Sequence, residues 1–151
     1  MSVIVTDDGF APDNWSGGFA DPADPGARAI ELDPEADLEA LAPRFASLEM
    51  IRVQFPVFRD GRGFSIARQL RLLGYRGRLR AAGHVLADQY AMARRCGFDE
   101  IEIDADLAAR QPEEHWLARA DWAVLDYQER LRRDAALIGW QSPASMTYIN
   151  D

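Results

Sequence analysis

Arginine and glycine are concentrated in the middle of this 151-residue chain, where the segment 59–65 reads R-D-G-R-G-F-S directly before a helical pattern. Guanidinium forks and the free N–H groups of a helix start both bind oxyanions. The segment therefore predicts an anion site, with three more polar residues farther along as members. The candidate anion-binding residues are Arg59, Asp60, Gly61, Arg62, Gly63, Ser65, Arg68, Arg80 and Asp88.

A structural explanation of the same loop is also open. In that case Asp60 pairs with Arg62 across a tight turn, and Ser65 caps the helix that follows. The glycine spacing is not a full dinucleotide-binding fingerprint, because Ile66 occupies the third glycine position. The loop therefore indicates a small anion or a simple turn rather than a nucleotide cofactor.

Histidine and cysteine are scarce. His84 follows a predicted strand, where it could exchange protons with carboxylates such as Asp88, or simply cap or pack. The single cysteine, Cys96, falls at an apolar helical position and is expected to be buried. These residues and His115 lie too far apart to predict a zinc or iron–sulfur site. We expect no metal and no cofactor, and whether the chain is an enzyme stays open.

The charge is unevenly distributed. Residues 52–95 hold ten arginines and two acids, for a charge of +8, whereas the rest of the chain carries −16, giving the net −8. All 17 basic residues are arginine, so lysine chemistry such as a Schiff base is excluded. The central arginines could bind oxyanions or pair with the acidic flanks of the same chain. An isoelectric point of about 4.7 argues against nucleic acid.

The N-terminus resembles neither a signal peptide nor a membrane anchor, because it lacks a basic start and a long apolar run. One cysteine leaves no internal disulfide. We therefore expect a cytoplasmic protein without membrane contact.

Alternating strand and helix patterns predict an α/β fold. Strands are expected at 48–55, 78–82 and 98–103, with helices at 65–73 and 85–96 between them. This parallel β-α-β-α-β unit resembles part of a (β/α) barrel. The expected single domain, 1–151, comprises an irregular lead-in with a helix starting near Asp33 (1–47), the core (48–104), and a helical cover and tail (105–151), within which 122–127 fits either strand or helix.

The three central strands alternate apolar and polar residues, so one face of the sheet should be polar. Arginines of the middle strand are expected to pair with glutamates of the third. Three interpretations of this face are open: it is solvated or covered by the N-terminal segment, it is a homodimer interface, or it is the wall of a ligand site. The predicted polar face consists of Arg52, Gln54, Arg78, Arg80, Glu100 and Glu102.

Three central segments carry a family resemblance: F-P-V-F-R-D-G-R-G-F-S-I-A-R-Q-L-R (55–71), G-Y-R-G-R-L-R-A-A-G-H-V-L-A-D-Q (74–89) and R-C-G-F-D (95–99). They closely resemble a bacterial family catalogued as domain of unknown function 934. Genes of this family tend to lie beside assimilatory sulfite reductase, so the resemblance implies a role in sulfite reduction with the reductase as partner. The chain is not the reductase itself, because it lacks the cysteines for an iron–sulfur cluster.

Two functions are compatible with these observations. The first is a non-redox accessory protein of assimilatory sulfite reduction that acts through protein contacts. The alternative is a small oxyanion-binding enzyme or carrier with its site at the carboxyl ends of the parallel strands, where ligands of open α/β sheets gather.

Overall fold

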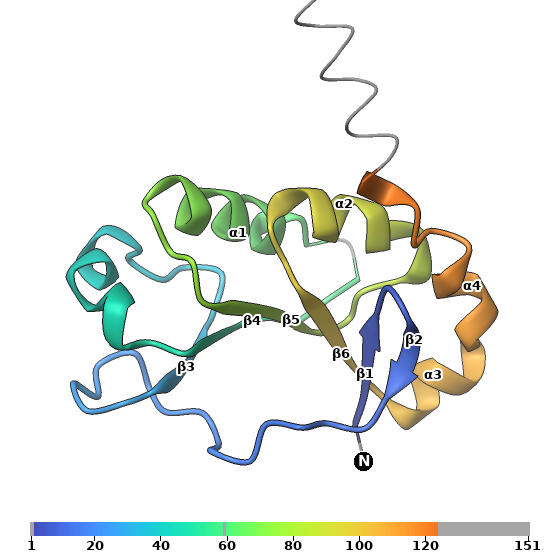
Figure 1. Cartoon of the computed structure of the whole chain (residues 1–151), viewed down its shortest axis with the longest axis horizontal. Helices are drawn as coiled ribbons and strands as arrows, with labels where there is room; N and C mark the ends of the chain where they lie inside the picture. Colours follow the sequence, from blue (N-terminus) through green and yellow to red (C-terminus); the bar gives the residue numbers. More distant parts are fainter. Residues whose placement is uncertain (1, 59, 124–151) are drawn as a thin grey trace, which may run out of the picture.

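Six strands form one mixed sheet in the computed structural model, which describes residues 2–58 and 60–123 (Figure 1). Their spatial order is β2-β1-β6-β5-β4-β3. Strands β3 to β6 run parallel, whereas β1 is antiparallel to both β6 and β2. The predicted α/β class and its parallel core are confirmed. The strands are β1 (Ser2–Thr6), β2 (Gly9–Ala11), β3 (Ala29–Leu32), β4 (Met50–Phe55), β5 (Arg78–Gly83) and β6 (Glu100–Asp104).

Helices α1 (Arg62–Leu72) and α2 (Tyr90–Cys96) cover one face of the sheet (Figure 1). They connect β4 to β5 and β5 to β6, which are neighbours in the sheet, so right-handed crossovers place both helices on the same side. Four further helical elements in the described part of the chain are short. They are the 3₁₀ helices η1 (Glu39–Ser47) and η2 (Ala87–Gln89), and the short helices α3 (Ala105–Arg110) and α4 (Glu113–Leu117).

The apolar core lies between this helix layer and the sheet. Strand β4 contributes Ile51, Val53 and Phe55, which are at most 1% exposed, while α1 contributes Ala67 and Leu70. Burying one large apolar side chain contributes about 1.5–3 kcal/mol. The alternation of apolar residues along the strands therefore fixes which face meets the helices, and it leaves the opposite face polar.

Two predicted helix starts are wrong. Helix α1 begins at Arg62, with Gly61 at the N-cap, so Ser65 lies within the first turn and does not cap the helix. The helix expected from Asp33 is replaced by a turn, in which the Asp33 carboxylate accepts a hydrogen bond from the Glu35 N–H at 2.9 Å. Aspartate side chains that bond two residues ahead compete with helix initiation, and only a 3₁₀ helix forms, after Leu38.

The second crossover helix is shorter than the predicted 85–96. Its first part is the 3₁₀ turn η2, where the Gln89 side chain accepts a hydrogen bond from the Leu86 N–H at 2.9 Å. The regular helix then ends at Gly97, whose φ of 115° is in the left-handed region, as the glycine predicts.

Strands β1 and β2 form an antiparallel hairpin within the lead-in that the sequence predicts to be irregular. Its second strand, β2, is held by α4, because the Glu113 carboxylate accepts a hydrogen bond from the Phe10 N–H at 2.7 Å. The turn of the hairpin is held by Asp7, which accepts hydrogen bonds from the side chains of Tyr90, Arg94 and Trp122.

The C-terminal predictions fall mostly beyond the described part of the chain. The tail and all but the first two residues of 122–127 lie outside it. Within 2–58 and 60–123, no helix has the length and apolar character needed to cross a bilayer.

Candidate functional site

The polar face of the sheet carries a network of ion pairs, which we call the charged face. The Arg78 Nε atom lies 2.7 Å from Glu100 Oε1, and the Arg80 Nη1 atom lies 2.8 Å from Glu102 Oε1. The predicted pairing between arginines of β5 and glutamates of β6 is confirmed. The charged face consists of Glu31, Arg52, Arg78, Arg80, Glu100 and Glu102.

Arg80 is the centre of the charged face, and its side chain is fully buried. It donates hydrogen bonds from Nε to Glu100, from Nη1 to Glu102, and from Nη1 and Nη2 to the two oxygens of Asp13 at 3.1 and 3.0 Å. Burial alone would lower the pKa of Arg80, but its bonds to Asp13 and the charge of Glu100 raise it instead. The guanidinium therefore stays charged, with four bonds to carboxylates of its own chain.

Arg52 extends the charged face to the next strands. It donates from Nε to Glu31 at 3.0 Å and from Nη1 to Glu102 at 3.1 Å, and the Phe19 ring centroid lies 3.8 Å from its Cζ atom. The strands thus supply three arginines and three glutamates. The charged face is electrically balanced before Asp13 is added.

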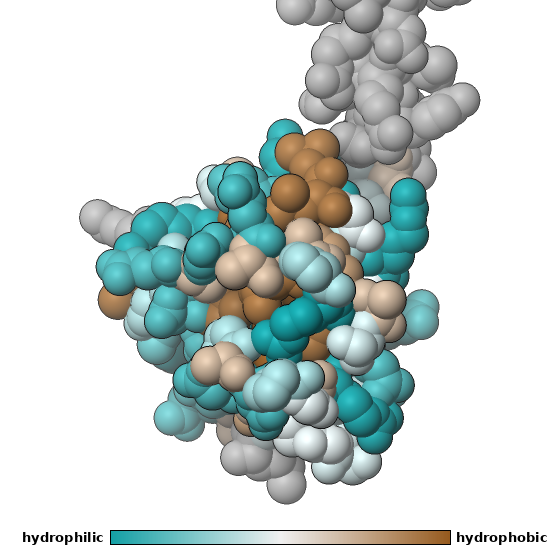
Figure 2. Space-filling view, turned by 90° about the vertical axis from the view of Figure 1, so that its left-hand side faces the viewer, coloured by the Kyte–Doolittle hydropathy of each residue, from teal (hydrophilic) through white to brown (hydrophobic). Residues whose placement is uncertain are grey.

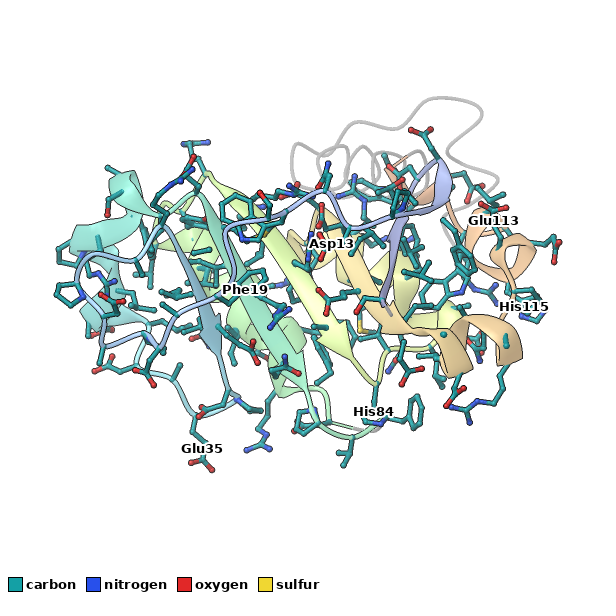
Figure 3. All side chains as sticks on the ribbon, turned by 90° about the horizontal axis from the view of Figure 1, so that it is seen from below. Asp13, Phe19, Glu35, His84, Glu113 and His115 are labelled. Atoms are coloured by element: carbon teal, nitrogen blue, oxygen red, sulfur yellow. The ribbon has the colours of Figure 1, made fainter. Side chains whose placement is uncertain are left out.

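Residues 12–19 cross the charged face as an extended segment, which we call the strap (Figure 3). Asp13 binds Arg80, while the side-chain oxygen of Asn14 accepts a hydrogen bond from Arg78 Nη2 at 2.6 Å. Directly after the strap, the Ala20 N–H bonds to the Ala29 carbonyl at 2.9 Å and so fixes the chain to β3. Of the three interpretations of the polar face, cover by the N-terminal segment is the one that these contacts favour.

The charged face is better suited to holding the strap than to moving protons. Arginine remains protonated at physiological pH. For Asp13, partial burial raises the pKa, but hydrogen bonds from Arg80 and the Trp15 N–H outweigh it and lower the pKa overall. A carboxyl with a lowered pKa is a poor general acid or base near neutral pH. The bidentate Asp13–Arg80 pair is instead a geometrically specific clamp.

The Asp60–Ser65 loop, which we call the α1 loop, adopts the turn of the structural explanation. The Asp60 carboxylate lies 2.6 Å from Arg62 Nη2 and also accepts a hydrogen bond from the Arg62 N–H at 3.1 Å. These bonds lower the pKa of Asp60 to about 2. Arg62 is further approached by Glu35, at 3.8 Å. Arg59 lies outside the described residues.

The two glycines of the α1 loop have different surroundings. A Cβ atom on Gly63 would stand 2.7 Å from the Cε1 atom of the Phe55 ring, whereas one on Gly61 would meet nothing within 4 Å. Gly63 is therefore explained by the close packing of α1 on β4, without a ligand.

The other candidate anion-binding residues do not join the α1 loop in the structure. Arg68 lies in the second turn of α1 rather than the first, and its nearest polar contact is the Cys96 sulfur at 4.0 Å. Asp88 pairs with Arg119, and Arg80 lies beneath the strap.

The isolated histidines and the cysteine lie apart from one another. His84 is exposed, with Nδ1 3.2 Å from the Phe55 carbonyl and its ring against Phe58. Since a carbonyl oxygen only accepts, Nδ1 carries the proton in this contact. Cys96 is buried, as predicted, and His115 is exposed on α4. In the part of the chain that the structure describes, no group of three or more histidine, cysteine or acidic side chains is placed to hold a metal ion.

A cavity of about 860 Å³ adjoins the charged face, and sequence reasoning missed it. Gln54, Glu31 and Phe19 form one side of it, and the turn that precedes η1 forms the other. Among the described residues that line it, Arg44 alone is basic, and it already donates to the carbonyls of Pro22 and Asp24. Because the charged residues that line this cavity are mainly acidic, the cavity favours cations over oxyanions. The acidic lining consists of Asp21, Glu31, Asp33, Glu35 and Asp37.

A second cavity, of about 460 Å³, has the opposite charge. It lies where α1 passes into β5, and Arg71, Arg76 and Arg78 line it with a single acid, Asp99. Arg71 donates to the backbone carbonyls of this loop, and Arg78 belongs to the charged face. Arg76 is exposed and has no carboxylate partner among the described residues.

The residues of the charged face and the strap that the sequence did not reveal are Asp13, Asn14 and Glu31. Glu31 could have been found, because it occupies the polar position of the alternating A-I-E-L segment 29–32. The strap offers no such signal, since a Gly- and Pro-rich extended segment has no period that would place its side chains.

Comparison with protein-family models gives a match. The model of a family described as a bacterial protein of unknown function (DUF934) matches residues 29–138, which include strands β3 to β6 and helices α1 to α4. The search of curated proteins finds no match.

Proposed function

Since this chain belongs to the DUF934 family of bacterial proteins of unknown function, we propose that it is a non-redox accessory protein of assimilatory sulfite reduction. It acts through protein contacts in the cytoplasm, with sulfite reductase as its partner. The link to the pathway rests on the resemblance of segments 55–71, 74–89 and 95–99, whose family accompanies the genes of the reductase.

The observation that carries a contact role is the saturation of the charged face. Arg52, Arg78 and Arg80 are all engaged by carboxylates of the same chain, and the strap lies across them. None of these three arginines of the charged face is therefore free to bind a small substrate. Arginines without a carboxylate partner among the described residues, such as Arg68, Arg76 and Arg95, are exposed, where a binding protein presents such groups.

The cysteine content of the chain also supports a non-redox role. The sequence has one cysteine, Cys96, and it is buried. An iron–sulfur cluster of a reductase requires several thiolate ligands. The proposal therefore assigns electron transfer to the partner and a supporting role to this protein.

The alternative function, an oxyanion-binding enzyme or carrier at the α1 loop, has less support. Arg62 is already paired with Asp60, and the larger cavity beside the charged face is acidic. Calorimetric titration of the full chain with sulfite, sulfate and phosphate tests this alternative. Saturable binding that Arg62→Gln removes would favour it.

The proposed function is tested by deleting the gene in its own bacterium. We expect slower growth on sulfate or sulfite as the sole sulfur source, normal growth on cysteine, and recovery when the wild-type gene is returned. Normal growth of the deletion strain on both inorganic sources would remove the pathway assignment. Light scattering of the purified chain separately tests the homodimer that one interpretation of the polar face implies.

A further inference from the structure

Part of the outer surface of the helix layer carries arginines without carboxylate partners among the described residues, although Arg62, Arg71 and Arg94 of the same helices are paired. Arg68, Arg76 and Arg95 are exposed and form no ion pair within residues 2–58 and 60–123. Helices α1 and α2 contain no acidic residue at all, with the sequences R-G-F-S-I-A-R-Q-L-R-L and Y-A-M-A-R-R-C. No acid on these helices can neutralise the arginines in place.

Large apolar side chains share this surface. Leu72 is 80% exposed, Leu73 41% and Met92 51%. Figure 2 looks onto the end of the molecule where α1 ends and shows apolar surface standing at the top among polar residues. Single exposed leucines are ordinary in soluble proteins. Two consecutive ones together with an exposed methionine and arginines without partners suit a contact surface, in which arginine and methionine are enriched.

We propose that this surface, which we call the helix face, docks an acidic protein partner. An apolar residue of the partner packs on Leu72 and Leu73, and a carboxylate at the 460 Å³ cavity pairs with Arg76, the lining arginine that has no carboxylate partner among the described residues. The helix face consists of Arg68, Leu72, Leu73, Arg76, Met92 and Arg95. The inference rests on the proposed function for the identity of the partner, sulfite reductase, and adds the surface and the chemistry of recognition.

The net charge of this chain favours a protein over other acidic partners of the helix face. The chain as a whole carries −8, so its long-range field repels a polyanion such as nucleic acid or an anionic membrane. A protein partner needs only a local acidic patch that contacts the arginines. The more distant acidic residues of this chain are then screened by salt. A second copy could offer its acidic residues within 21–39, so self-association is one of the outcomes that the test distinguishes.

The test measures binding of the purified full chain to purified sulfite reductase. Two variants change the helix face, Arg76→Glu and Leu72→Asp. The matched control is Arg110→Glu, which reverses an exposed arginine on α3 that has no carboxylate partner among the described residues. All three positions are exposed, so unchanged unfolding midpoints are expected and would show that any effect is on binding.

We expect Arg76→Glu and Leu72→Asp each to weaken binding by about ten-fold or more, and Arg110→Glu to leave it unchanged. Equal binding by all variants would overturn the helix face as the docking surface and leave the proposed function standing. No binding by the wild-type chain would overturn both. Self-association that Arg76→Glu abolishes would assign the surface to a second copy instead and also overturn the proposal.

Discussion

The charged face and the helix face lie on opposite sides of one sheet. Both contain several arginines, but the arginines have different surroundings on the two faces. On the charged face, Arg52, Arg78 and Arg80 are partly or fully buried and bonded to carboxylates. On the helix face, Arg68 and Arg95 are exposed and form no ion pair with a described residue. A count of arginines cannot distinguish these roles, because the acidic partners of the first group are distant in the sequence.

The difference follows from the burial of each side. A buried charge must be paired, since a desolvated ion without a partner costs several kcal/mol. An exposed arginine keeps its hydration and needs no partner. The charged face is therefore expected to govern stability, and the helix face recognition. Mutations in the two regions should separate these properties.

The largest effect is expected from Arg80→Met, which removes the buried centre of the charged face. The buried Glu100 and the partly buried Glu102 would then lose their shared cation and keep Arg78 and Arg52, respectively. Breaking a buried pair in this way costs about 3–5 kcal/mol. Urea unfolding of the wild type and the variant measures the loss.

The matched control is Arg68→Met, for which a change within about 0.5 kcal/mol is expected. If the two variants lost similar stability, the contrast between the two faces would be wrong.

The sequence predicted the charged face because a strand has a period of two. Arg78 and Arg80 had to share one side, and Glu100 and Glu102 had to lie beside them. The position of Asp13 depends on how the strap crosses the sheet, which no local pattern encodes. The start of α1 was misplaced for a related reason, since Asp60 and Arg62 stabilise a turn that lets the helix begin before Ser65.

The next effect concerns a glycine beneath the helix layer. Gly63→Ala would place a methyl group against the Phe55 ring, and overpacking of a core typically costs about 1–3 kcal/mol. Gly61→Ala is the control, because the space around Gly61 is open. Thermal unfolding of both variants measures the difference. A destabilised Gly61→Ala with an unaffected Gly63→Ala would contradict the packing explanation and favour an anion site in the α1 loop.

A smaller, pH-dependent effect is expected at Asp13. Its pKa in the folded protein is lowered below the ordinary 3.8, so the ionised carboxylate stabilises the fold above about pH 4, and this stabilisation is lost as the pH falls through the lowered value. Asp13→Asn should therefore cost about 1.5 kcal/mol near pH 7, the lower range for a hydrogen bond to a charged group. The deficit should shrink toward pH 2.

The control for this measurement is Asp8→Asn, on the exposed turn of the hairpin, whose carboxylate has no arginine partner among the described residues. Urea unfolding from pH 7 to pH 2 compares the three proteins. A deficit of Asp13→Asn that stayed constant over this range would show that Asp13 does not hold the strap through its charge.

The smallest effect on stability is expected from Arg95→Gln on the helix face, and this variant separates the two regions most sharply. Because Arg95 is exposed and forms no ion pair with a described residue, the free energy of unfolding should change by less than about 0.5 kcal/mol. Its affinity for the reductase should nevertheless fall, because a charged contact of a docking surface contributes to association without contributing to folding. A clear loss of stability would show that Arg95 is already engaged within its own chain, and the helix face would then be a structural surface like the charged face.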